Sequence, residues 1–381
     1  MRTQAQFDYF DVPQRKTGRT YGVKYAGSKA KLIPHIMREI GELSGHRVLD
    51  GFAGTTRVTQ ALAEAGHSVV CNDRSPLSKV MADCFLFGHG RDKLYQQQIQ
   101  HLNDLMPCDG WYTEHYGADG SSLQSAGRDG LKKPWQYQNT RKLDAIRPEI
   151  DKISLDGINK SVLLTSLIFA LDTVDNTIGH YAAYLDKWSL RSNKIMKLVV
   201  PNVLDSMGER NHETHQSDIF DILNNNTFDI CYFDPPYGSN NEKMPPSRVR
   251  YDAYYHLWKT VIFNDKPKLF GKVNRREDTR DNYDASLFES FKKDDGGRFV
   301  AVNAIDRLLR EANTKYIILS YSSGGRATFE CLMDVISSSG RVIKVAELDY
   351  KKNVMANMTW TGEWLREFEE PNREYVFVIE K

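Results

Sequence analysis

Residues 229–238 are the feature that most constrains what this chain can fold into. They read Asp-Ile-Cys-Tyr-Phe-Asp-Pro-Pro-Tyr-Gly, in which an apolar, aromatic and β-branched run predicts a buried strand. Two prolines, which cannot donate ladder hydrogen bonds, end this strand directly after Asp234. Ligands of open α/β sheets bind at the carboxyl ends of the strands. We therefore expect Asp234 and Tyr237 to project into a ligand-binding crevice.

The residue types at this strand end suit a flat heterocycle that carries an exocyclic amino group. The carboxylate of Asp234 can accept one amine hydrogen, the carbonyl of Pro235 the other, and the ring of Tyr237 can stack on the base. The alternative, from these four residues alone, is a strand that ends in a Pro-Pro turn with a solvated acid. Chemistry on a base amino group is the hypothesis that the rest of the sequence must support.

Residues 46–73 predict a βαβ unit that binds an adenosine. A strand leads into the turn Asp50-Gly51-Phe52-Ala53-Gly54, a helix follows, and the next strand ends at Asp73. A dinucleotide site would require glycine at position 50, because a carboxylate repels phosphates. S-adenosylmethionine carries an ammonium, a sulfonium and no phosphate, so Asp50 favours it and disfavours a nicotinamide oxidoreductase. An ordinary βαβ unit with a solvated acid remains the alternative.

Composition excludes some classes of protein and leaves others open. The 381 residues, 40% hydrophobic and 27% charged, are typical of a globular protein with a large insertion or a second domain. The net charge of +1 neither indicates nor excludes nucleic-acid binding. Five cysteines without a Cys-x-x-Cys pair predict neither a zinc site nor a disulfide framework, which fits a reducing cytoplasm. We therefore expect no metal. We also expect no membrane association, because the apolar runs are too short to span a bilayer.

Four motifs in a fixed order resemble the alpha group of N6-adenine DNA methyltransferases, the DNA adenine methylase type. They are the segment 24–29 (Lys-Tyr-Ala-Gly-Ser-Lys), the turn 50–54, Asp73, and the Asp-Pro-Pro-Tyr of residues 234–237. The resemblance implies an α/β, Rossmann-like S-adenosylmethionine methyltransferase fold. Its sheet is mostly parallel and seven-stranded with an antiparallel last strand, and a largely helical DNA-recognition region is inserted. The implied reaction is site-specific methyl transfer from S-adenosyl-L-methionine to N6 of adenine in duplex DNA, by base flipping and direct in-line displacement.

The resemblance also implies roles for individual residues. The catalytic set is Asp234, Pro235, Pro236 and Tyr237. The cofactor-binding set is Tyr25, Ala26, Gly27, Lys29, Asp50, Phe52, Gly54, Thr55, Thr56, Asp73 and Asp218. Within it, Asp73 is expected to hold the ribose and Asp218 the adenine amino group of the cofactor, with helix capping as a compatible role for Asp218. Many members have a second glycine where this chain has Thr56. Thr55 or Thr56 could cap the helix or bind the methionine carboxylate.

Long spacings between the motifs predict two insertions. We assign residues 1–85 and 210–381 to a catalytic domain, residues 86–209 to an inserted helical target-recognition region, and residues 240–314 to a second insertion with a basic DNA-contacting loop. Between Asp73 and Asp218, helices are expected near residues 79–87, 95–105 and 161–171. The cations expected to contact DNA are Lys132, Lys133, Lys272, Arg275, Arg276, Lys351 and Lys352. A solvated insertion without a DNA contact is the alternative. His180 is not assigned a catalytic role, because methyl transfer from a sulfonium does not require a general base.

Three other functions are compatible with parts of this sequence. An RNA methyltransferase acting on a guanine or adenine amine is the nearest, and the two insertions and the motif at residues 24–29 argue against it. N4-cytosine transfer generally replaces the acid of Asp-Pro-Pro-Tyr by Ser or Thr, and a non-catalytic DNA-binding subunit would not need that motif intact. The expected partner is double-stranded DNA, and the expected setting is the modification half of a restriction-modification system. The sequence leaves open the cognate endonuclease, the recognition sequence and the oligomeric state.

Overall fold

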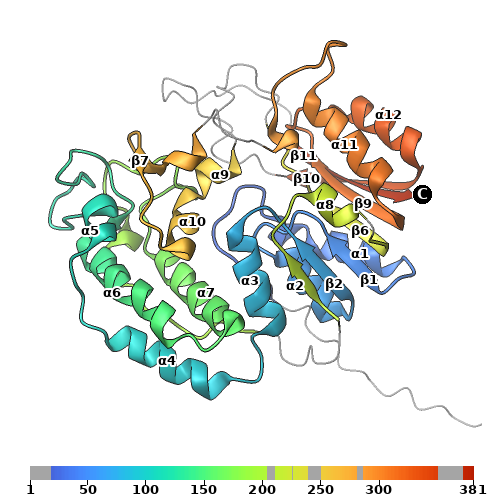
Figure 1. The fold of residues 1–381 in the computed structure, drawn as a ribbon. Coiled ribbons are helices and arrows are strands. Elements are labelled where there is room, and N and C mark those ends of the chain that lie inside the picture. The colour runs from blue at the N-terminus through green and yellow to red at the C-terminus, as the bar shows by residue number, and fades with distance from the viewer. Residues whose placement is uncertain (1–18, 204–210, 225, 239–249, 281–285, 351–371) are drawn as a thin grey trace, which may run out of the picture.

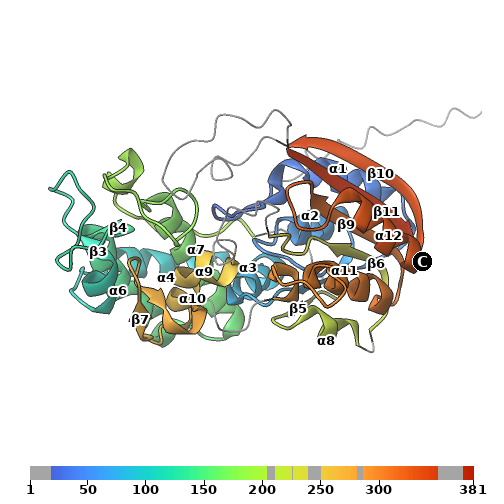
Figure 2. The same cartoon turned by 90° about the horizontal axis from the view of Figure 1, so that it is seen from above.

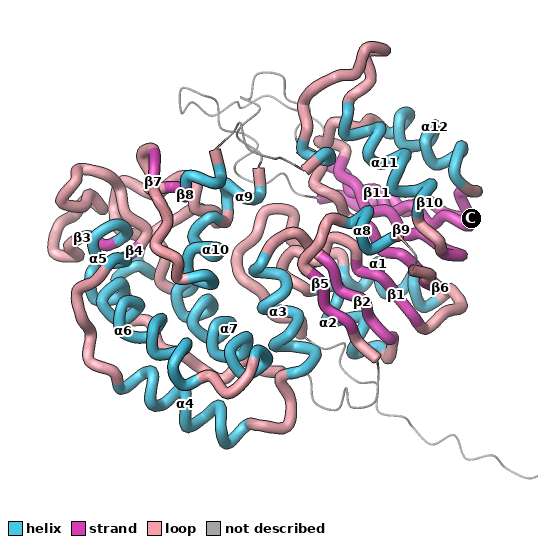
Figure 3. Tube along the Cα trace, in the orientation of Figure 1, coloured by secondary structure: helices cyan, strands magenta, loops and turns pink. Residues whose placement is uncertain are grey.

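The protein has a sheet-based lobe and a helical lobe, which lie side by side (Figures 1 and 2). The computed structural model describes residues 19–203, 211–224, 226–238, 250–280, 286–350 and 372–381. Figure 3 shows that the long strands are gathered in the sheet lobe, whereas the second lobe is built from helices with two short strand pairs. No helix in these ranges combines the length and the apolar character that crossing a bilayer requires.

A seven-stranded sheet forms the centre of the first lobe, in the order β10-β11-β9-β6-β1-β2-β5. Its strands are β1 (Arg47–Asp50), β2 (Ser68–Asn72), β5 (Glu213–His215), β6 (Phe228–Phe233), β9 (Thr314–Ser322), β10 (Arg341–Tyr350) and β11 (Asn372–Glu380). β11 runs antiparallel to both of its neighbours, and the other neighbouring pairs are parallel. The predicted mostly parallel sheet with an antiparallel last strand is therefore confirmed.

The strand order reverses between β1 and β6, and this topological switch point is where open α/β sheets bind ligands. The register places Asp50, at the end of β1, level with Tyr232 of β6, which stands two residues before Asp234. Asp73 directly follows the neighbouring strand β2. Three acids from three separate chain segments thus meet at one edge of the sheet, as the motifs had predicted.

Helices cover both faces of the sheet because each strand alternates its side chains between them. In β6, Ile230 and Tyr232 face one layer, and Cys231 and Phe233 face the other. The first layer contains α1 (Ile33–Gly41), α2 (Arg57–Ala65) and α3 (Pro76–Phe87), preceded by the short η1 (Lys29–Lys31). The second contains α8 (Ile219–Leu223), α11 (Val300–Glu311) and α12 (Phe329–Ser339).

The helical lobe has its own apolar core, which includes the buried side chains of Trp135, Tyr181 and Trp258. Its helices are α4 (Asp92–Asp104), α5 (Trp111–Tyr116), α6 (Tyr137–Ile153), α7 (Gly157–Thr173), α9 (Tyr251–Tyr254) and α10 (His256–Phe263). Short strands pair β3 (Gly117–Ala118) with β4 (Trp135–Gln136), and β7 (Leu269–Phe270) with β8 (Arg275–Arg276). The three expected helices correspond to α3, α4 and α7. Helix α6 was not expected, since charges and Pro148 interrupt its apolar face.

Both insertions contribute to this one lobe. Arg147 of α6 is fully buried and donates to the carbonyls of Val261 and Ile262 at the end of α10, the second at 2.8 Å. Its guanidinium also pairs with Asp151 at 2.8 Å. The predicted second insertion extends to residue 314, but α11 packs on the sheet with α12, so its last part belongs to the sheet lobe.

Replacing Arg147 by Met should loosen the helical lobe. The substitution leaves two buried carbonyls of α10 without donors, and we expect it to lower the free energy of unfolding by about 2–4 kcal/mol. Arg141→Met is the matched control on the same helix, because the ion pair of Arg141 with Asp109 is exposed and should change stability by no more than about 0.5 kcal/mol. Urea unfolding measures both. Equal effects of the two variants would contradict a structural role for the buried guanidinium.

Candidate active site

A cavity opens at the carboxyl ends of β1, β2 and β6, and both lobes line it. The sequence-predicted catalytic and cofactor residues line it with two exceptions, Thr56 and Tyr237. Further residues line it that were not assigned to the site from sequence, among them Tyr232 of β6, Tyr251 and Tyr255 from the second insertion, and Phe288 and Glu289 of η5 (Leu287–Glu289). The structure therefore brings the sequence motifs into one site and adds a wall from the helical lobe.

Asp50 is a buried acid with one unused oxygen. Thr59 donates its hydroxyl to Oδ2 at 2.6 Å, whereas Oδ1 is buried without a hydrogen-bond partner among the described residues. Burial raises the pKa of Asp50 to about 7; the hydrogen bond from Thr59 opposes the rise and the charge of Asp73 adds to it. A buried carboxylate that lacks a counter-charge is costly. The site thus fits a ligand that brings a cationic group to this oxygen.

Asp73 holds the turn after β1 in place. Its two oxygens accept backbone N–H groups, Oδ2 from Gly54 at 2.8 Å and Oδ1 from Ser75 at 2.8 Å. Gly54 has a φ of +51°, and a Cβ there would lie 3.3 Å from the ring of Tyr25, so glycine suits this position both in conformation and in space. A carboxylate oxygen can accept more than one hydrogen bond, so Asp73 keeps acceptor capacity for ligand hydroxyls.

Thr56 does not have the role that the sequence suggested. Its side chain makes no capping hydrogen bond to α2; instead, its hydroxyl accepts from Gln60 at 3.0 Å, and the residue is fully buried behind the cavity. Its φ of +60° is unusual for a β-branched residue. The backbone at this turn therefore keeps the left-handed geometry that a glycine would take easily. Thr55 does line the cavity.

The motif at residues 25–27 packs against the helical lobe. The ring of Tyr25 stacks on Tyr255 with centroids 4.2 Å apart and an angle of 13°, so one of its faces is covered. The backbone N–H of Ala26 donates to the hydroxyl of Tyr255 at 2.6 Å, and the hydroxyl of Tyr251 donates to the carbonyl of Ala26 at 3.2 Å. Gly27, at a φ of +75°, leaves room for the hydroxyl of Tyr251, which a Cβ would meet at 3.0 Å. Helix α9 thereby becomes part of the site.

Asp218 and Phe52 border another part of the cavity. Asp218 caps α8 by accepting the N–H of Phe220 at 3.1 Å and also lines the cavity, so its two predicted roles are compatible. The ring of Phe52 stands edge-on to Phe288, with centroids 5.0 Å apart and an angle of 82°. Together these groups offer an acceptor and aromatic surfaces, a combination that suits a flat heterocycle.

Lys29 lies at the centre of the Asp-Pro-Pro-Tyr segment. Its ammonium contacts Asp234 Oδ1 at 2.9 Å, the hydroxyl of Tyr237 at 2.9 Å and Glu374 Oε1 at 2.6 Å. The ammonium donates hydrogen bonds to Tyr237 and Glu374, whereas its contact with Asp234 is an ion pair: Oδ1 of Asp234 has no hydrogen-bond partner among the described residues. Lys29 was predicted to bind the cofactor; although it lines the cavity, its donors are directed to protein groups. The ring of Tyr237 stands edge-on to Tyr321, at 5.3 Å and 65°, and its stacking on a target base stays a prediction.

Burial and neighbouring charges determine the protonation of Asp234. Burial raises its pKa to about 7, the ammonium of Lys29 works against this rise, and the charges of Glu374 and Asp50 add to it. Burial also disfavours the charged form of Lys29, but Asp234 and Glu374 outweigh this effect and raise the pKa of Lys29 well above its usual value. Lys29 is therefore a permanent cation, whereas Asp234 titrates near neutral pH.

Comparison with known proteins identifies the family of this chain. The model of the D12 class of N6 adenine-specific DNA methyltransferases matches residues 25–323, most of the chain. The chain belongs to this family. Type II methyltransferase M.NlaIII of Neisseria lactamica is 27% identical over 377 residues, which are 94% of this chain and 99% of that protein. Modification methylase LlaI of Lactococcus lactis subsp. lactis is 24% identical over 359 residues, 90% of this chain but 53% of that protein.

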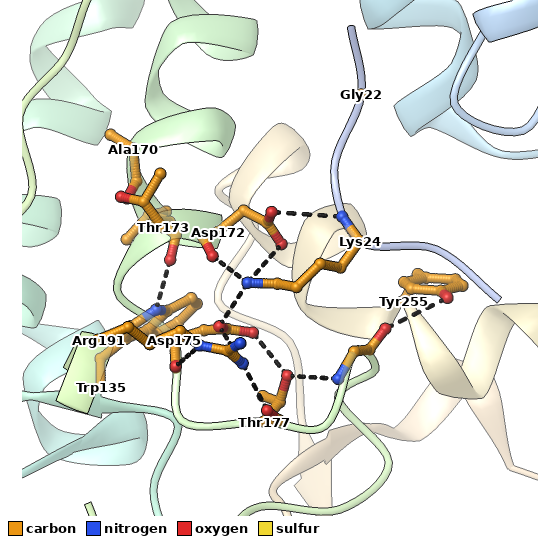
Figure 4. A network of polar contacts seen from close by, with 12 residues as sticks. Gly22, Lys24, Trp135, Ala170, Asp172, Thr173, Asp175, Thr177, Arg191 and Tyr255 are labelled. Atoms are coloured by element: carbon orange, nitrogen blue, oxygen red, sulfur yellow. Dashed lines mark hydrogen bonds and ion pairs between the residues drawn. The ribbon is translucent and has the colours of Figure 1, made fainter. Parts of the chain in front are cut away.

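A polar network links the N-terminal segment of the methyltransferase site to the helical lobe (Figure 4). The ammonium of Lys24 contacts Asp175 at 2.8 Å and the carbonyl of Asp172, at the end of α7. Arg191 pairs with the carboxylate of Asp175 at 2.8 Å, and the hydroxyl of Thr177 donates to the same carboxylate at 2.6 Å. Because Lys24 precedes Tyr25 directly, this buried carboxylate ties the cavity wall to the turn that follows α7.

His180 lies in that turn and has a structural environment. Its ring stacks on Tyr254 at 4.5 Å and 13°, and its Nδ1 accepts the N–H of Ala182 at 3.1 Å. Burial lowers the pKa of His180 to about 4, so the ring is neutral at physiological pH. The imidazole of His180 is therefore neutral and packed on Tyr254, and its lack of a catalytic role stays a prediction.

The predicted DNA-contacting cations fall into three groups. Lys133 and Arg276 are buried: Lys133 binds Asp129 and the carbonyl of His115, and Arg276 pairs with Asp265 and Asp278, which corrects their assignment to a DNA-facing surface. Lys132 and Lys272 are exposed, and Arg275 is half-buried, with its guanidinium over the ring of Phe270. Lys351 and Lys352 lie outside the described residues.

Methyl transfer should fail at acidic pH, because a protonated Asp234 is a weaker acceptor for the amine hydrogen and cannot stabilise positive charge on the amine. With the methyl donor saturating, kcat/KM for DNA should be constant above about pH 8 and fall tenfold per pH unit well below pH 7. A pH–rate profile in one buffer series at constant ionic strength measures this. A profile that stays flat down to pH 5 would contradict ionised Asp234 as the active form.

Proposed function

We propose that this methyltransferase uses S-adenosyl-L-methionine to methylate N6 of adenine at a specific sequence in double-stranded DNA. The observation that carries the proposal is the presence, in one cavity, of two acids with different surroundings. Asp50 is fully buried, has an unpartnered oxygen and forms no ion pair with the described residues, whereas Asp234 is paired with the ammonium of Lys29 and precedes two prolines. One acid suits a cationic amino-acid group and the other suits the amine that is methylated.

The cavity residues fit the proposed methyl donor group by group. Asp50 would bind the ammonium, Asp73 the ribose hydroxyls, and Asp218 with Phe52 the adenine. The hydroxyl of Tyr232 also lines the cavity, is buried, and has no hydrogen-bond partner among the described residues, so it offers one more polar contact. When bound, S-adenosyl-L-methionine supplies an electrophilic methyl group. The protein contributes the shape and the acceptors that place this group.

Asp234 and the carbonyl of Pro235 would act on the target amine. Each accepts one amine hydrogen, which withdraws the nitrogen lone pair from the ring and directs it toward the methyl donor for in-line displacement. Orientation of this kind can contribute about 7–11 kcal/mol, so a covalent intermediate is not required. The base would leave the duplex at a cost of about a few kcal/mol. Stacking on Tyr237 would offset part of this cost.

We propose that the helical lobe, residues 86–203 together with 250–280, recognises the DNA sequence. The lobe carries the exposed Lys132 and Lys272 and the half-buried Arg275, and it forms one wall of the cavity through Tyr251 and Tyr255. Surface cations of this kind would bind backbone phosphates, while neighbouring polar side chains would read base edges. Of the second insertion expected at residues 240–314, this proposal keeps for DNA recognition only residues 250–280, the part that packs with α6 and α7.

The setting of the reaction is inferred from the names of the relatives. M.NlaIII is a type II methyltransferase, and LlaI and StsI, the latter from Streptococcus sanguinis, are modification methylases. We therefore infer that this protein is the modification enzyme of a cytoplasmic restriction-modification system. An endonuclease that cuts the same sequence would be its functional partner, and methylation would protect the host DNA from it.

Substitutions of the two acids should have separable effects. Asp234→Ala should abolish transfer but leave the dissociation constant of S-adenosyl-L-methionine within a few-fold of wild type. Asp50→Asn should weaken cofactor binding by about 10- to 100-fold, since a charge-assisted hydrogen bond is lost, and should keep transfer at saturating cofactor. Calorimetry and nucleoside mass spectrometry after digestion of duplex DNA measure these effects. Methylated RNA with unmodified DNA would instead favour an RNA methyltransferase.

Salt dependence tests the DNA-binding surface. Replacing Lys272 or Lys132 by Ala should reduce the slope of log affinity against log salt concentration by about 1 for each phosphate contact that is lost. Lys315→Ala is the matched control, because Lys315 lies at the start of β9, at the opposite end of the sheet from the cavity. Unchanged slopes for Lys272→Ala and Lys132→Ala would exclude both lysines as phosphate contacts.

A further inference from the structure

Glu374 is a buried acid that no motif predicted, and it lies beyond residues 25–323, the part matched by the family model. It stands near the start of β11, level with Ser322 of β9, and is 3% exposed. Its Oε1 accepts the ammonium of Lys29 at 2.6 Å and the hydroxyl of Ser320 at 2.8 Å. It does not line the cavity, so it acts on the site only through its neighbours.

We propose that Glu374 is a positioning residue for the reaction: it holds the ammonium of Lys29 in the one place from which it can orient both Asp234 and Tyr237. The inference rests on the proposed function, in which Asp234 accepts a hydrogen of the target amine. Lysine has a long, flexible side chain, and an ammonium without a fixed partner would lose its geometry. Ser320 and Glu374 belong to adjacent strands of the sheet, which makes the anchor rigid.

Glu374 also contributes charge. Lys29 neutralises one of the two carboxylates that contact it, so the group of Lys29, Asp234 and Glu374 carries one net negative charge when all three are ionised. The ionisable groups that interact with Asp234 from the surrounding elements are Lys29 of η1, Asp50 of β1, Tyr232 of β6, Tyr237, Tyr251 of α9 and Glu374 of β11. Among them Lys29 lowers the pKa of Asp234, whereas Glu374 and Asp50 raise it.

These charges predict the direction in which each substitution moves the acid limb of the pH–rate profile. Glu374→Gln keeps an acceptor for Lys29 but removes a negative charge, so the acid limb of the pH–rate profile should move to lower pH. Lys29→Met removes the cation and leaves two facing carboxylates, so the limb should move to higher pH. Adding Glu374→Gln to Lys29→Met removes the repulsion, and the limb should return toward its original position. A purely structural role for Glu374 would not produce opposite shifts and a rescue.

The decisive experiment compares kcat, KM, cofactor affinity and pH–rate profiles of Glu374→Gln and Glu374→Ala. Glu374→Ala removes the anchor, and kcat should fall by about 10- to 100-fold with the cofactor dissociation constant within about twofold of wild type. Glu380→Gln is the control on the same strand, since Glu380 is paired with Arg341 at the opposite end of β11. Wild-type kcat and an unmoved acid limb in both Glu374 variants would overturn the proposal, as would equal losses of kcat and cofactor binding.

A titration that requires no turnover separates this inference from the proposed function. The side-chain carboxyl carbons of aspartates are labelled with ¹³C, and the resonance of Asp234 is assigned by its loss in Asp234→Asn. Its midpoint should shift to lower pH in Glu374→Gln and to higher pH in Lys29→Met. If the midpoints do not move, the inference fails even where the wild type methylates adenine. If they move but the wild type modifies no adenine, the proposed function fails and the charge coupling stands.

Discussion

The geometry of the site depends on the contacts that the buried ammonium of Lys29 makes. A charge removed from water is tolerated only where opposite charges and hydrogen bonds replace its hydration. Asp234, Tyr237 and Glu374 supply these groups from the segment after β6 and from β11. Because the same contacts that satisfy Lys29 also fix the Asp-Pro-Pro-Tyr segment, the stability of the sheet edge and the orientation of the proposed catalytic acid have one cause.

The cavity depends equally on contacts between the lobes. Tyr25 stacks on Tyr255, and Lys24 binds Asp175 and the end of α7 (Figure 4). The segment that borders the proposed cofactor site is therefore attached on one side to the lobe that we propose reads DNA. Residues 25–27 therefore line the cavity and pack on the helical lobe at the same time.

Local sequence predicted much of this arrangement. The strand before Asp234 and the βαβ unit with Asp50 and Asp73 could be predicted because hydrophobic periodicity and turn residues act within a few positions of the chain. Where the sequence misled, the reason was burial. Lys133 and Arg276 are cations that a sequence assigns to the surface by default, yet each is enclosed with its own carboxylate partners. Burial depends on packing between helices that are distant in the chain.

The chemistry of the site could be inferred from local sequence: an acid at the end of a buried strand, a second acid in a turn unsuited to phosphates, and an order of motifs shared with adenine methyltransferases. The groups that surround these acids follow from tertiary packing. Glu374 reaches Lys29 across 345 positions of the chain, and Tyr251 reaches Ala26 across 225. Contacts at such separations follow from how strands and lobes pack, which no local pattern of residues encodes. For that reason the residues proposed to act in the reaction could be predicted from sequence, whereas the charged residues that contact them could not.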